Sequence, residues 1–301
     1  MASASENSGL RVLVTGLEGF TGRYVRAELG AAGHSIFGLR SADGAPIDLL
    51  DRDGVRAAVA RIQPQAVIHL AAVSFAAHGD VDAIYRTNIV GTHHLLSALA
   101  SLTEPPSATL LASSAHVYGD AQGRLDETTP LAPANDYAVS KVAMEFMAAT
   151  WSAQLPLLIA RPFNYTGVGQ AGHFLIPKIV DHFRRGEQHI ELGNLDVWRE
   201  FMDVRTVAWA YRRLLETDGN RAVLNICAGA SHSLREVLDM MAGIAGYAIE
   251  VSVNPAFVRD NEMQRLEGDP GRLLARIGAG PSFTLEDTLR WMYEIPDFRH
   301  A

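Results

Sequence analysis

The chain has 301 residues, with 26 basic and 34 acidic side chains, a net charge of −8 and a hydrophobic share of 48%. This ordinary soluble composition, without a basic run or a long apolar stretch, argues against a general nucleic-acid binder and against a membrane protein. At roughly 150 residues per domain, the length predicts two domains, or one large domain with an appendage.

Five short apolar runs rich in Val, Ile and Leu are typical of strands that are buried on both faces of a sheet. Helical patterns lie between them. This alternation predicts right-handed βαβ units that build a parallel sheet with helices on both faces. The predicted strands are 10–15, 35–39, 66–71, 109–113 and 157–161, and the predicted helices are 21–32, 51–62, 81–102 and 137–153.

After about residue 166 the pattern loosens into a helix, an irregular stretch, a second helix and a strand. Ser233 and Glu236 have the spacing of a capping box, and Thr284 and Asp287 repeat that spacing before a final helix. The elements predicted in this half are helices at 174–185, 204–216 and 234–245 and a strand at 223–227.

The fold class predicted from these patterns is α/β: a Rossmann-like, doubly wound parallel sheet with a smaller C-terminal substrate-binding subdomain. We assign residues 9–167 to a dinucleotide-binding domain, and we expect residues 200–228 to return to it. Residues 168–199 and 229–301 would form the substrate-binding subdomain.

Three glycines, Gly16, Gly19 and Gly22, lie between the first predicted strand and the first predicted helix. Glycine permits a tight turn and lets backbone N–H groups approach a diphosphate at the start of a helix. The GxxGxxG spacing departs from the common GxGxxG. Its place in the first βα unit favours a dinucleotide site over a chance glycine-rich turn.

The second predicted strand ends at Arg40 and Ser41, where an NAD-binding fold would carry an acidic residue for the ribose hydroxyls. A guanidinium and a hydroxyl suit a 2′-phosphate instead. NADP(H) is therefore the preferred cofactor and NAD(H) the alternative, because Arg40 could also be an ordinary solvated loop charge. Asp48 is a candidate acceptor for the adenine amino group.

Tyr137 and Lys141 are four residues apart in a predicted helix and so share one face. A cation beside a phenol lowers its pKa, and reduction of a carbonyl needs a proton on oxygen. Strand 109–113 ends in serines that could bond the same oxygen, although serines at strand ends are often only turn formers. The chain has only one other lysine, Lys178.

These motifs, in this order and over nearly the whole chain, resemble the extended short-chain dehydrogenase/reductase family. The resemblance implies that Ser114, Tyr137 and Lys141 are catalytic. The residues that it and the glycine turn imply for the cofactor are Gly16, Gly19, Phe20, Thr21, Gly22, Arg40, Ser41, Asp48, Leu49, Leu70, Ala71, Ala72, Asn88, Tyr137, Lys141 and Pro162.

Within the family, sugar-nucleotide 4,6-dehydratases carry a glutamate where this chain has His116, so dehydration is disfavoured. The segments 161–170, 193–204 and 224–229 resemble the GDP-4-keto-6-deoxy-mannose reductases. This resemblance implies reduction of the C4 ketone of a GDP-linked sugar, to GDP-rhamnose or GDP-6-deoxy-talose. Two positions depart from that subgroup, which commonly has His in place of Tyr165 and Pro in place of Val168.

Substrate contacts are also implied by the resemblance. Asn164 and Arg199 would contact the diphosphate or base, and Arg259 and Glu262 the phosphate and ribose. His116 and His173 either line the sugar pocket, which we favour, or move protons beside the ketone. The full implied set is Val73, Ser74, His116, Asn164, His173, Phe174, Arg199, Arg259 and Glu262.

Two other functions remain open at this stage: a nucleotide-sugar epimerase or epimerase/reductase with tightly bound NAD(P), and a non-catalytic NADP-binding sensor. The resemblance also implies a homodimer formed through helices 81–102 and 137–153.

Cys227, the single cysteine, can form neither an internal disulfide nor a metal site by itself. We therefore expect a cytoplasmic enzyme without metal.

Overall fold

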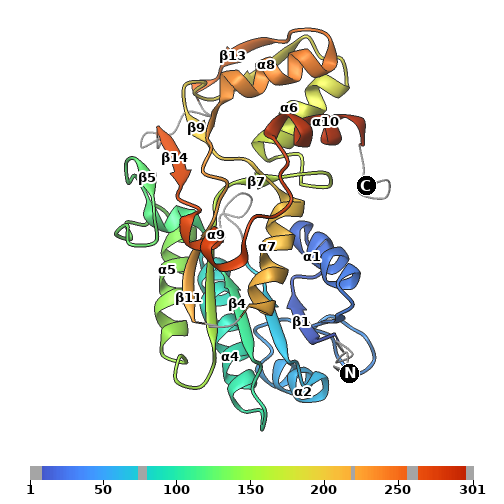
Figure 1. Cartoon of the computed structure of the whole chain (residues 1–301), viewed down its shortest axis with the longest axis vertical. Helices are drawn as coiled ribbons and strands as arrows, with labels where there is room; N and C mark the ends of the chain where they lie inside the picture. The colour runs from blue at the N-terminus through green and yellow to red at the C-terminus, as the bar shows by residue number, and fades with distance from the viewer. Residues whose placement is uncertain (1–8, 74–79, 218–220, 256–263, 296–301) are drawn as a thin grey trace, which may run out of the picture.

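The computed structural model describes residues 9–73, 80–217, 221–255 and 264–295. Its centre is a six-stranded parallel sheet in the order β11-β6-β4-β3-β1-β2 (Figure 1), which confirms the predicted Rossmann-like fold. All the strands predicted from the sequence belong to this sheet. They are β1 (Arg11–Thr15), β2 (Ser35–Gly38), β3 (Ala66–His69), β4 (Ala108–Ala112), β6 (Leu157–Pro162) and β11 (Ala222–Ile226).

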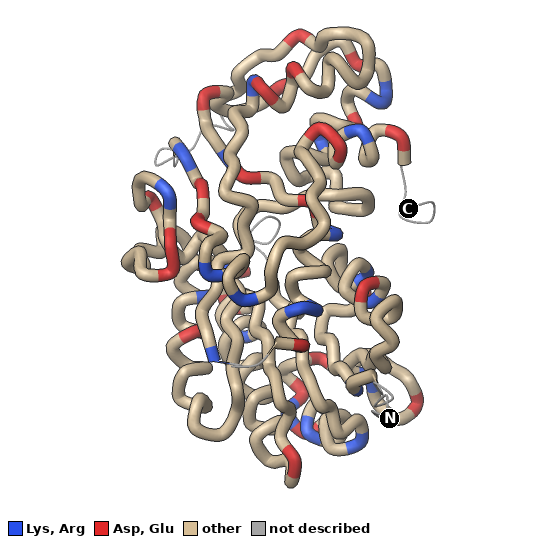
Figure 2. The backbone as a smooth tube through the Cα atoms, in the orientation of Figure 1, with Lys and Arg blue, Asp and Glu red and all other residues tan. Residues whose placement is uncertain are grey.

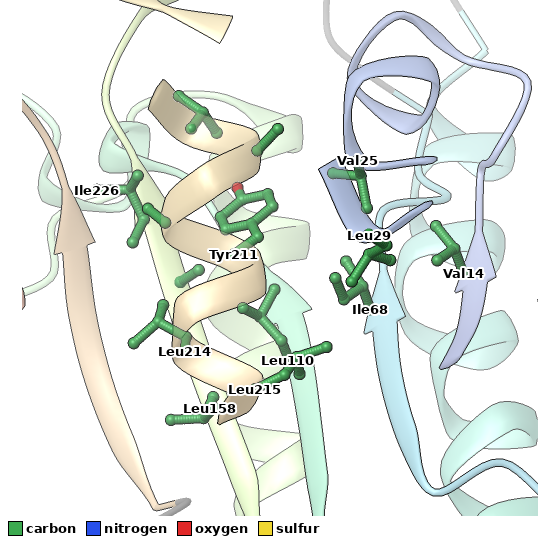
Figure 3. Close-up of a cluster of buried hydrophobic side chains, with 14 of the residues drawn as sticks. Val14, Val25, Leu29, Ile68, Leu110, Leu158, Tyr211, Leu214, Leu215 and Ile226 are labelled. Carbon is green, nitrogen blue, oxygen red and sulfur yellow. The ribbon is translucent and has the colours of Figure 1, made fainter. Parts of the chain in front are cut away.

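Successive residues of each strand pack into opposite faces of the sheet, which is why the strands read as continuous apolar runs. Leu13 and Val67 belong to one core cluster, and Val14 and Ile68 to the other. Figure 3 shows the second cluster, where Tyr211 and Leu214 lie over the sheet. Helices α2 (Arg52–Ile62), α4 (Thr92–Ala100) and α5 (Asp136–Ala149) cover the first face, and α1 (Phe20–Ala31), α7 (Val204–Glu216) and α9 (Gly271–Ile277) the second.

The helix predicted at 81–102 is interrupted. It consists of α3 (Val81–Tyr85), a π-helical turn (Arg86–Gly91) and α4. A π-helical turn holds one residue more than an α-helical turn, and such turns often mark functional sites. Apolar periodicity cannot register this local change, so the sequence predicted one continuous helix. The turn contains Asn88, one of the predicted cofactor residues.

A second core lies above the carboxyl ends of the strands (Figure 1), in what we call the helical lobe. The capping boxes predicted at Ser233 and Thr284 are both present. The helical lobe contains α6 (Leu175–Arg184), α8 (Leu234–Ala245) and α10 (Leu285–Glu294), with the parallel strands β8 (His189–Leu192) and β13 (Glu250–Val253).

Short strands build the region between the helical lobe and the six-stranded sheet with its covering helices, which we call the sheet lobe; this region includes the stretch whose sequence pattern was irregular. A four-stranded sheet has the order β12-β9-β14-β5. Its members are β5 (Arg124–Leu125), β9 (Trp198–Arg199), β12 (His232–Ser233) and β14 (Arg265–Gly268). A parallel pair, β7 (Tyr165–Thr166) and β10 (Met202–Asp203), is called the junction sheet below.

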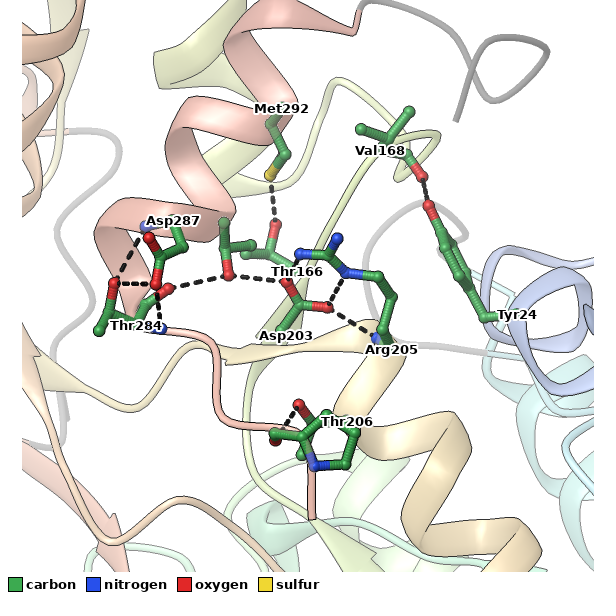
Figure 4. Close-up of polar contacts among 11 residues, drawn as sticks. Tyr24, Thr166, Val168, Asp203, Arg205, Thr206, Thr284, Asp287 and Met292 are labelled. Atoms are coloured by element: carbon green, nitrogen blue, oxygen red, sulfur yellow. Dashed lines mark hydrogen bonds and ion pairs between the residues drawn. The ribbon is translucent and has the colours of Figure 1, made fainter. Parts of the chain in front are cut away.

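The junction sheet is tied to the helical lobe by a buried carboxylate (Figure 4). Asp203, 2% exposed, accepts from Thr288 Oγ1 of α10 at 2.8 Å and pairs with Arg205 Nη2 of α7 at 2.7 Å. The Arg205 guanidinium lies 3.8 Å from the ring centroids of both Phe283 and Trp291. One charge pair therefore connects α7, which covers the sheet, with α10 of the helical lobe.

Charged residues of both signs are interspersed along the backbone of both lobes, as Figure 2 shows. Among the described residues, no helix has the length and apolar character needed to cross a membrane. The domain boundaries proposed from the sequence stay a prediction.

Candidate active site

The glycine turn joins β1 to α1 and requires glycine at two of its three glycine positions, Gly16 and Gly22. Gly16 has φ +72°, a left-handed conformation that favours glycine. A Cβ on Gly22 would lie 2.2 Å from the Gly16 carbonyl oxygen, so no side chain fits there. The N-cap of α1, Gly19, makes no side-chain capping bond, and the first turn carries no acidic residue. The start of α1 is therefore a suitable binding site for an anion.

One cavity of about 1020 Å³ lies between the glycine turn, the carboxyl ends of the strands and the helical lobe. It brings together residues that are more than 180 positions apart in the chain. The predicted site residues that line it are Gly16, Gly19, Phe20, Thr21, Gly22, Leu70, Ala72, Ser114, His116, Tyr137, Lys141, Pro162, Asn164, His173, Phe174 and Arg199.

Ser114 is the second residue after β4 and caps a short 3₁₀ helix (Ala115–Tyr118). Its hydroxyl accepts from the His116 backbone N–H at 3.2 Å and lies 3.0 Å from His116 Nδ1. The imidazole also meets the Tyr137 ring edge to face, with 6.1 Å between centroids. His116 thus contacts two of the three candidate catalytic side chains, which the sequence did not indicate.

Tyr137 lies in the first turn of α5, which Asn135 caps through a 2.9 Å bond from the Ala138 N–H. The sequence suggested that a nearby cation would lower the pKa of this phenol. That expectation is wrong, because burial raises the pKa of Tyr137 to about 12, Tyr165 adds to the rise, and a hydrogen bond from Ser114 opposes it. The Tyr137 phenol therefore keeps its proton near neutral pH.

The Lys141 ammonium lies 5.7 Å from the centre of the Tyr137 ring and donates to the Ala112 carbonyl oxygen at 2.8 Å. Burial lowers the pKa of Lys141 to about 8, against the opposing effect of Glu145. The cation is thus present below about pH 8 and lost above it. Lys141 is the candidate catalytic group that titrates closest to neutrality.

A buried ion pair between Glu145 and Arg161 adjoins the candidate catalytic residue Lys141, and it was not predicted from the sequence. Glu145 and Arg161 bond through Oε2–Nη2 at 2.6 Å and Oε1–Nε at 3.0 Å. Ser113 donates to the same carboxylate at 2.5 Å, and Arg161 donates to the Tyr118 hydroxyl at 3.1 Å. The one available signal was that Glu145 follows Lys141 by four residues on the same face of α5.

Asn88 acts on the site from outside the cavity. Its amide accepts from the Val73 N–H at 2.9 Å, donates to the Val73 carbonyl at 3.2 Å and donates to Ser140 Oγ at 2.9 Å. Ser140 in turn donates to the Tyr137 carbonyl at 2.7 Å. The π-helical turn therefore joins the segment after β3 to the helix that carries Tyr137.

The predicted 2′-phosphate residues lie beside the glycine turn but are engaged with other groups. Arg40 pairs with Glu18, inside the turn, at 3.0 Å and donates to the Gly44 carbonyl at 2.9 Å. The Ser41 hydroxyl bonds to the Asp43 carboxylate. The Arg40 and Arg26 guanidiniums hold the pKa of Glu18 below its ordinary value. A phosphate at this position would compete with the Glu18 carboxylate for Arg40.

The cavity wall on the side of the helical lobe includes a residue that sequence analysis left without a role. Lys178, in the first half of α6, lines the cavity and donates to the Glu191 carbonyl at 2.8 Å. His173 packs on Phe174 with ring centroids 4.4 Å apart, and Arg199 donates to the Trp198 carbonyl at 2.9 Å. The signal for Lys178 was its rarity, since the chain has only two lysines.

Some predicted residues contribute nothing to the lining of the cavity, and others cannot be placed. Of the described residues, those outside the lining are Arg40, Ser41, Asp48, Leu49, Ala71, Val73 and Asn88. Ser74, Arg259 and Glu262 fall outside the described residues. Within the described part of the chain, no cluster of His, Cys, Asp and Glu could hold a metal ion.

Comparison with known proteins identifies relatives over almost the whole chain. Residues 12–227 match the NAD dependent epimerase/dehydratase family. A GDP-6-deoxy-D-mannose reductase from Pseudomonas aeruginosa is 36% identical, over 93% of this chain and 95% of the relative. A GDP-6-deoxy-D-talose 4-dehydrogenase from Aggregatibacter actinomycetemcomitans is 30% identical, over 91% and 94%.

Two solved structures are also similar to this chain over almost its whole length. A putative epimerase from Burkholderia cenocepacia has a TM-score of 0.90 and 47% identity, covering 95% of this chain and 97% of its own. RMD from Pseudomonas aeruginosa, solved in complex with NADPH, has a TM-score of 0.86 and 33% identity with the same coverage. The fold and the arrangement of the two lobes are therefore shared with a protein that binds NADPH.

Proposed function

The chain belongs to the NAD dependent epimerase/dehydratase family, and on that basis we propose that it uses NADPH to reduce the C4 ketone of a GDP-linked 4-keto-6-deoxy sugar. One observation carries the proposal. The glycine turn, Ser114, Tyr137 and Lys141 line one cavity in a chain similar over its length to a GDP-6-deoxy-D-mannose reductase. The product is GDP-rhamnose or its C4 epimer, GDP-6-deoxy-talose.

When bound, NADPH would supply the hydride for the proposed reaction. Tyr137 donates its phenolic proton to the carbonyl oxygen of the sugar, and its pKa of about 12 keeps that proton in place until charge develops on the oxygen. The Ser114 hydroxyl bonds the same oxygen, held by the His116 backbone at 3.2 Å. The Lys141 ammonium, anchored on Ala112, stabilises the phenolate that remains.

The proposed substrate lies with its sugar at Ser114 and Tyr137 and its GDP group toward the helical lobe. Arg199 and Lys178 supply positive charge on that side of the cavity, and Asn164 supplies an amide. A guanidinium and an ammonium suit the two phosphates of a nucleoside diphosphate. Because the chain is acidic overall, this local positive charge is what would attract an anionic substrate.

The decisive experiment is to incubate the purified protein with GDP-4-keto-6-deoxy-mannose and either NADPH or NADH, and to assign the C4 configuration of the product by NMR. We expect stoichiometric oxidation of NADPH and a single product epimer, with slower turnover on NADH. No oxidation of either cofactor would contradict the proposal.

A nucleotide-sugar epimerase is the second candidate, favoured by the similarity to a putative epimerase from Burkholderia cenocepacia. An epimerase would keep its cofactor bound and interconvert sugars without consuming it. Protein purified with stoichiometric NAD(P) that converts a nucleotide sugar without added cofactor would favour this function. Binding of NADPH with no turnover on any nucleotide sugar would instead favour a sensor.

The proposed assembly is a homodimer formed through α3, the π-helical turn and α5. Large apolar side chains are exposed there: Phe146 at 67%, Val81 at 43%, Val90 at 42% and Val139 at 37%. Such residues gather where a partner covers them. Phe146→Glu should convert a dimer into a monomer in sedimentation experiments, whereas Phe146→Leu should not. A monomeric parent protein would contradict the assembly.

The proposed partner is thus a small anionic molecule, and the proposed location is the cytoplasm. The only cysteine, Cys227, is a buried free thiol. A protein without disulfides suits a reducing compartment.

A further inference from the structure

Tyr165 reaches from the junction sheet to the start of the glycine helix. Its hydroxyl lies 2.8 Å from Oγ1 of Thr21, the second residue of α1. Its ring stacks on Phe20 with centroids 6.1 Å apart and planes 9° apart. All three residues line the cavity. A side chain from the segment between the lobes therefore ends at the anion-binding end of α1.

One of the two hydroxyl protons of Thr21 and Tyr165 is available for a further hydrogen-bond acceptor. Thr21 and Tyr165 have two hydroxyl protons between them, and their mutual bond uses one. Burial raises the pKa of the Tyr165 phenol, so it stays protonated. The N-cap Gly19 offers no side-chain acceptor, and the first turn has no acidic residue. The natural acceptor at this position is an anion bound to the backbone N–H groups of the glycine turn.

Tyr165 also lies close to the proposed chemistry. It contributes to the rise in the pKa of Tyr137, so the two phenols interact electrostatically. The line from Thr21 through Tyr165 to Tyr137 thus runs from the anion-binding turn to the proton donor. A dinucleotide with its diphosphate at the glycine turn and its nicotinamide near Tyr137 would span the same path.

We propose that Tyr165 positions the cofactor: its hydroxyl, aligned by Thr21 and by stacking on Phe20, donates a hydrogen bond to the diphosphate of the bound dinucleotide. This inference rests on the proposed use of NADPH. Tyr165 would donate this bond from the junction sheet, whereas the backbone N–H groups of the glycine turn would bind the diphosphate from α1. Cofactor binding therefore links α1 to the junction sheet, whose Asp203 is bonded to α10.

The chain contains a matched control. Tyr24, also on α1, donates through its hydroxyl to the Val168 carbonyl at 2.6 Å (Figure 4). This bond likewise joins α1 to the segment that follows β7. Tyr24 does not contribute to the lining of the cavity. Tyr165→Phe and Tyr24→Phe each remove one buried phenolic hydroxyl between the same two parts of the molecule, but only the first faces the cofactor site.

The test is to measure the Kd for NADPH by fluorescence titration, and the melting temperature with and without NADPH, for the parent and both variants. Tyr165→Phe should raise the Kd about tenfold, the effect of one hydrogen bond to a charged group, and should shrink the NADPH-induced rise in melting temperature. Tyr24→Phe should lower the melting temperature and leave the Kd within about twofold, because its bond only joins protein to protein.

A third variant separates the contribution of the hydrogen-bond donor to NADPH affinity from that of the tyrosine ring. Tyr165→His retains a hydrogen-bond donor and should lose less affinity than Tyr165→Phe. If Tyr165→Phe binds NADPH like the parent, or if both Phe variants weaken binding equally, the inference is wrong. If the parent binds NADPH but reduces no sugar, the proposed function fails while the Kd comparison still judges Tyr165. A parent that binds no NADPH refutes both.

Discussion

The two sides of the cavity are built differently. The sheet side, with Ser114, Tyr137 and Lys141, consists of segments that follow strands and of the first two turns of α5, and Ser114 and Lys141 are each only 5% exposed. The helical-lobe side, with Lys178 and Arg199, consists of half-buried side chains on α6 and on short strands. The sheet side is supported by the buried ion pair of Glu145 and Arg161, whereas Lys178 and Arg199 on the second side donate to backbone carbonyl oxygens and stay half-buried.

This difference suggests a division of labour. Buried groups have perturbed pKa values and fixed positions, which suit proton transfer. Half-buried charges cost little to desolvate, which suits capture and release of a charged ligand. Changes on the sheet side should therefore alter kcat, and changes on the helical-lobe side should alter KM.

The largest effect should come from Tyr137→Phe. Loss of a positioned general acid reduces turnover by about 10²- to 10⁴-fold. Because the ring and the fold are retained, NADPH binding measured by fluorescence should stay near normal. Turnover within a few fold of the parent would remove Tyr137 from the proposed mechanism.

The pH dependence of kcat tests Lys141. Its pKa of about 8 means that the ammonium is charged below that pH and neutral above it, so kcat should fall as the pH rises through about 8. Tyr137, with a pKa of about 12, contributes no titration in that range. Lys141→Met should be slow at every pH and should lack this alkaline decline. An unchanged profile would mean that another group controls the rate.

Lys178→Met tests the opposite side of the cavity. Removing one charged contact to a diphosphate should raise the KM for the nucleotide sugar about tenfold. The kcat and the Kd for NADPH should change little. A fall in kcat with unchanged KM would break the proposed division between the two sides.

A smaller effect is expected from Glu18→Gln. This change removes the carboxylate that pairs with Arg40 at 3.0 Å, and exposed pairs of this kind contribute about 0–1 kcal/mol. The ratio of NADPH to NADH affinity should therefore rise by a few fold. An equal gain for both cofactors would indicate that Arg40 does not recognise the 2′-phosphate.

The smallest effect is expected from His116→Ala. The imidazole contacts Ser114 and Tyr137 from the side, but the Ser114 hydroxyl keeps its bond to the backbone of residue 116. Reduction should stay mostly intact. Solvent deuterium at C3 or C5 of the product with the parent, and none with the variant, would instead assign an acid–base role to His116.

Much of the sheet side could be predicted because it depends on local signals. Apolar runs located the strands, the glycines located the turn between β1 and α1, and the four-residue spacing placed Tyr137 and Lys141 on one face of α5. On the helical-lobe side, two-residue strands such as β9 and β10 carry no periodicity that a sequence pattern can register.

The failed expectation about Tyr137 and the contacts that the sequence did not predict have one physical origin. A raised pKa at Tyr137, the pairing of Arg40 with Glu18 and the ion pair of Glu145 with Arg161 all depend on what surrounds a side chain. Residues 22 or 16 positions apart along the chain become neighbours only after the sheet forms. No local motif reports such contacts.

The amino-acid sequence by itself determined the parallel sheet, the glycine turn between β1 and α1 and the types of residue that carry the proposed chemistry, because these follow from periodicity, glycine conformation and side-chain chemistry. Only the tertiary structure decided which charges are paired, which phenols retain their protons and that Tyr165 reaches Thr21. Burial and long-range proximity set these properties, since both desolvation and hydrogen bonding depend on distances in space.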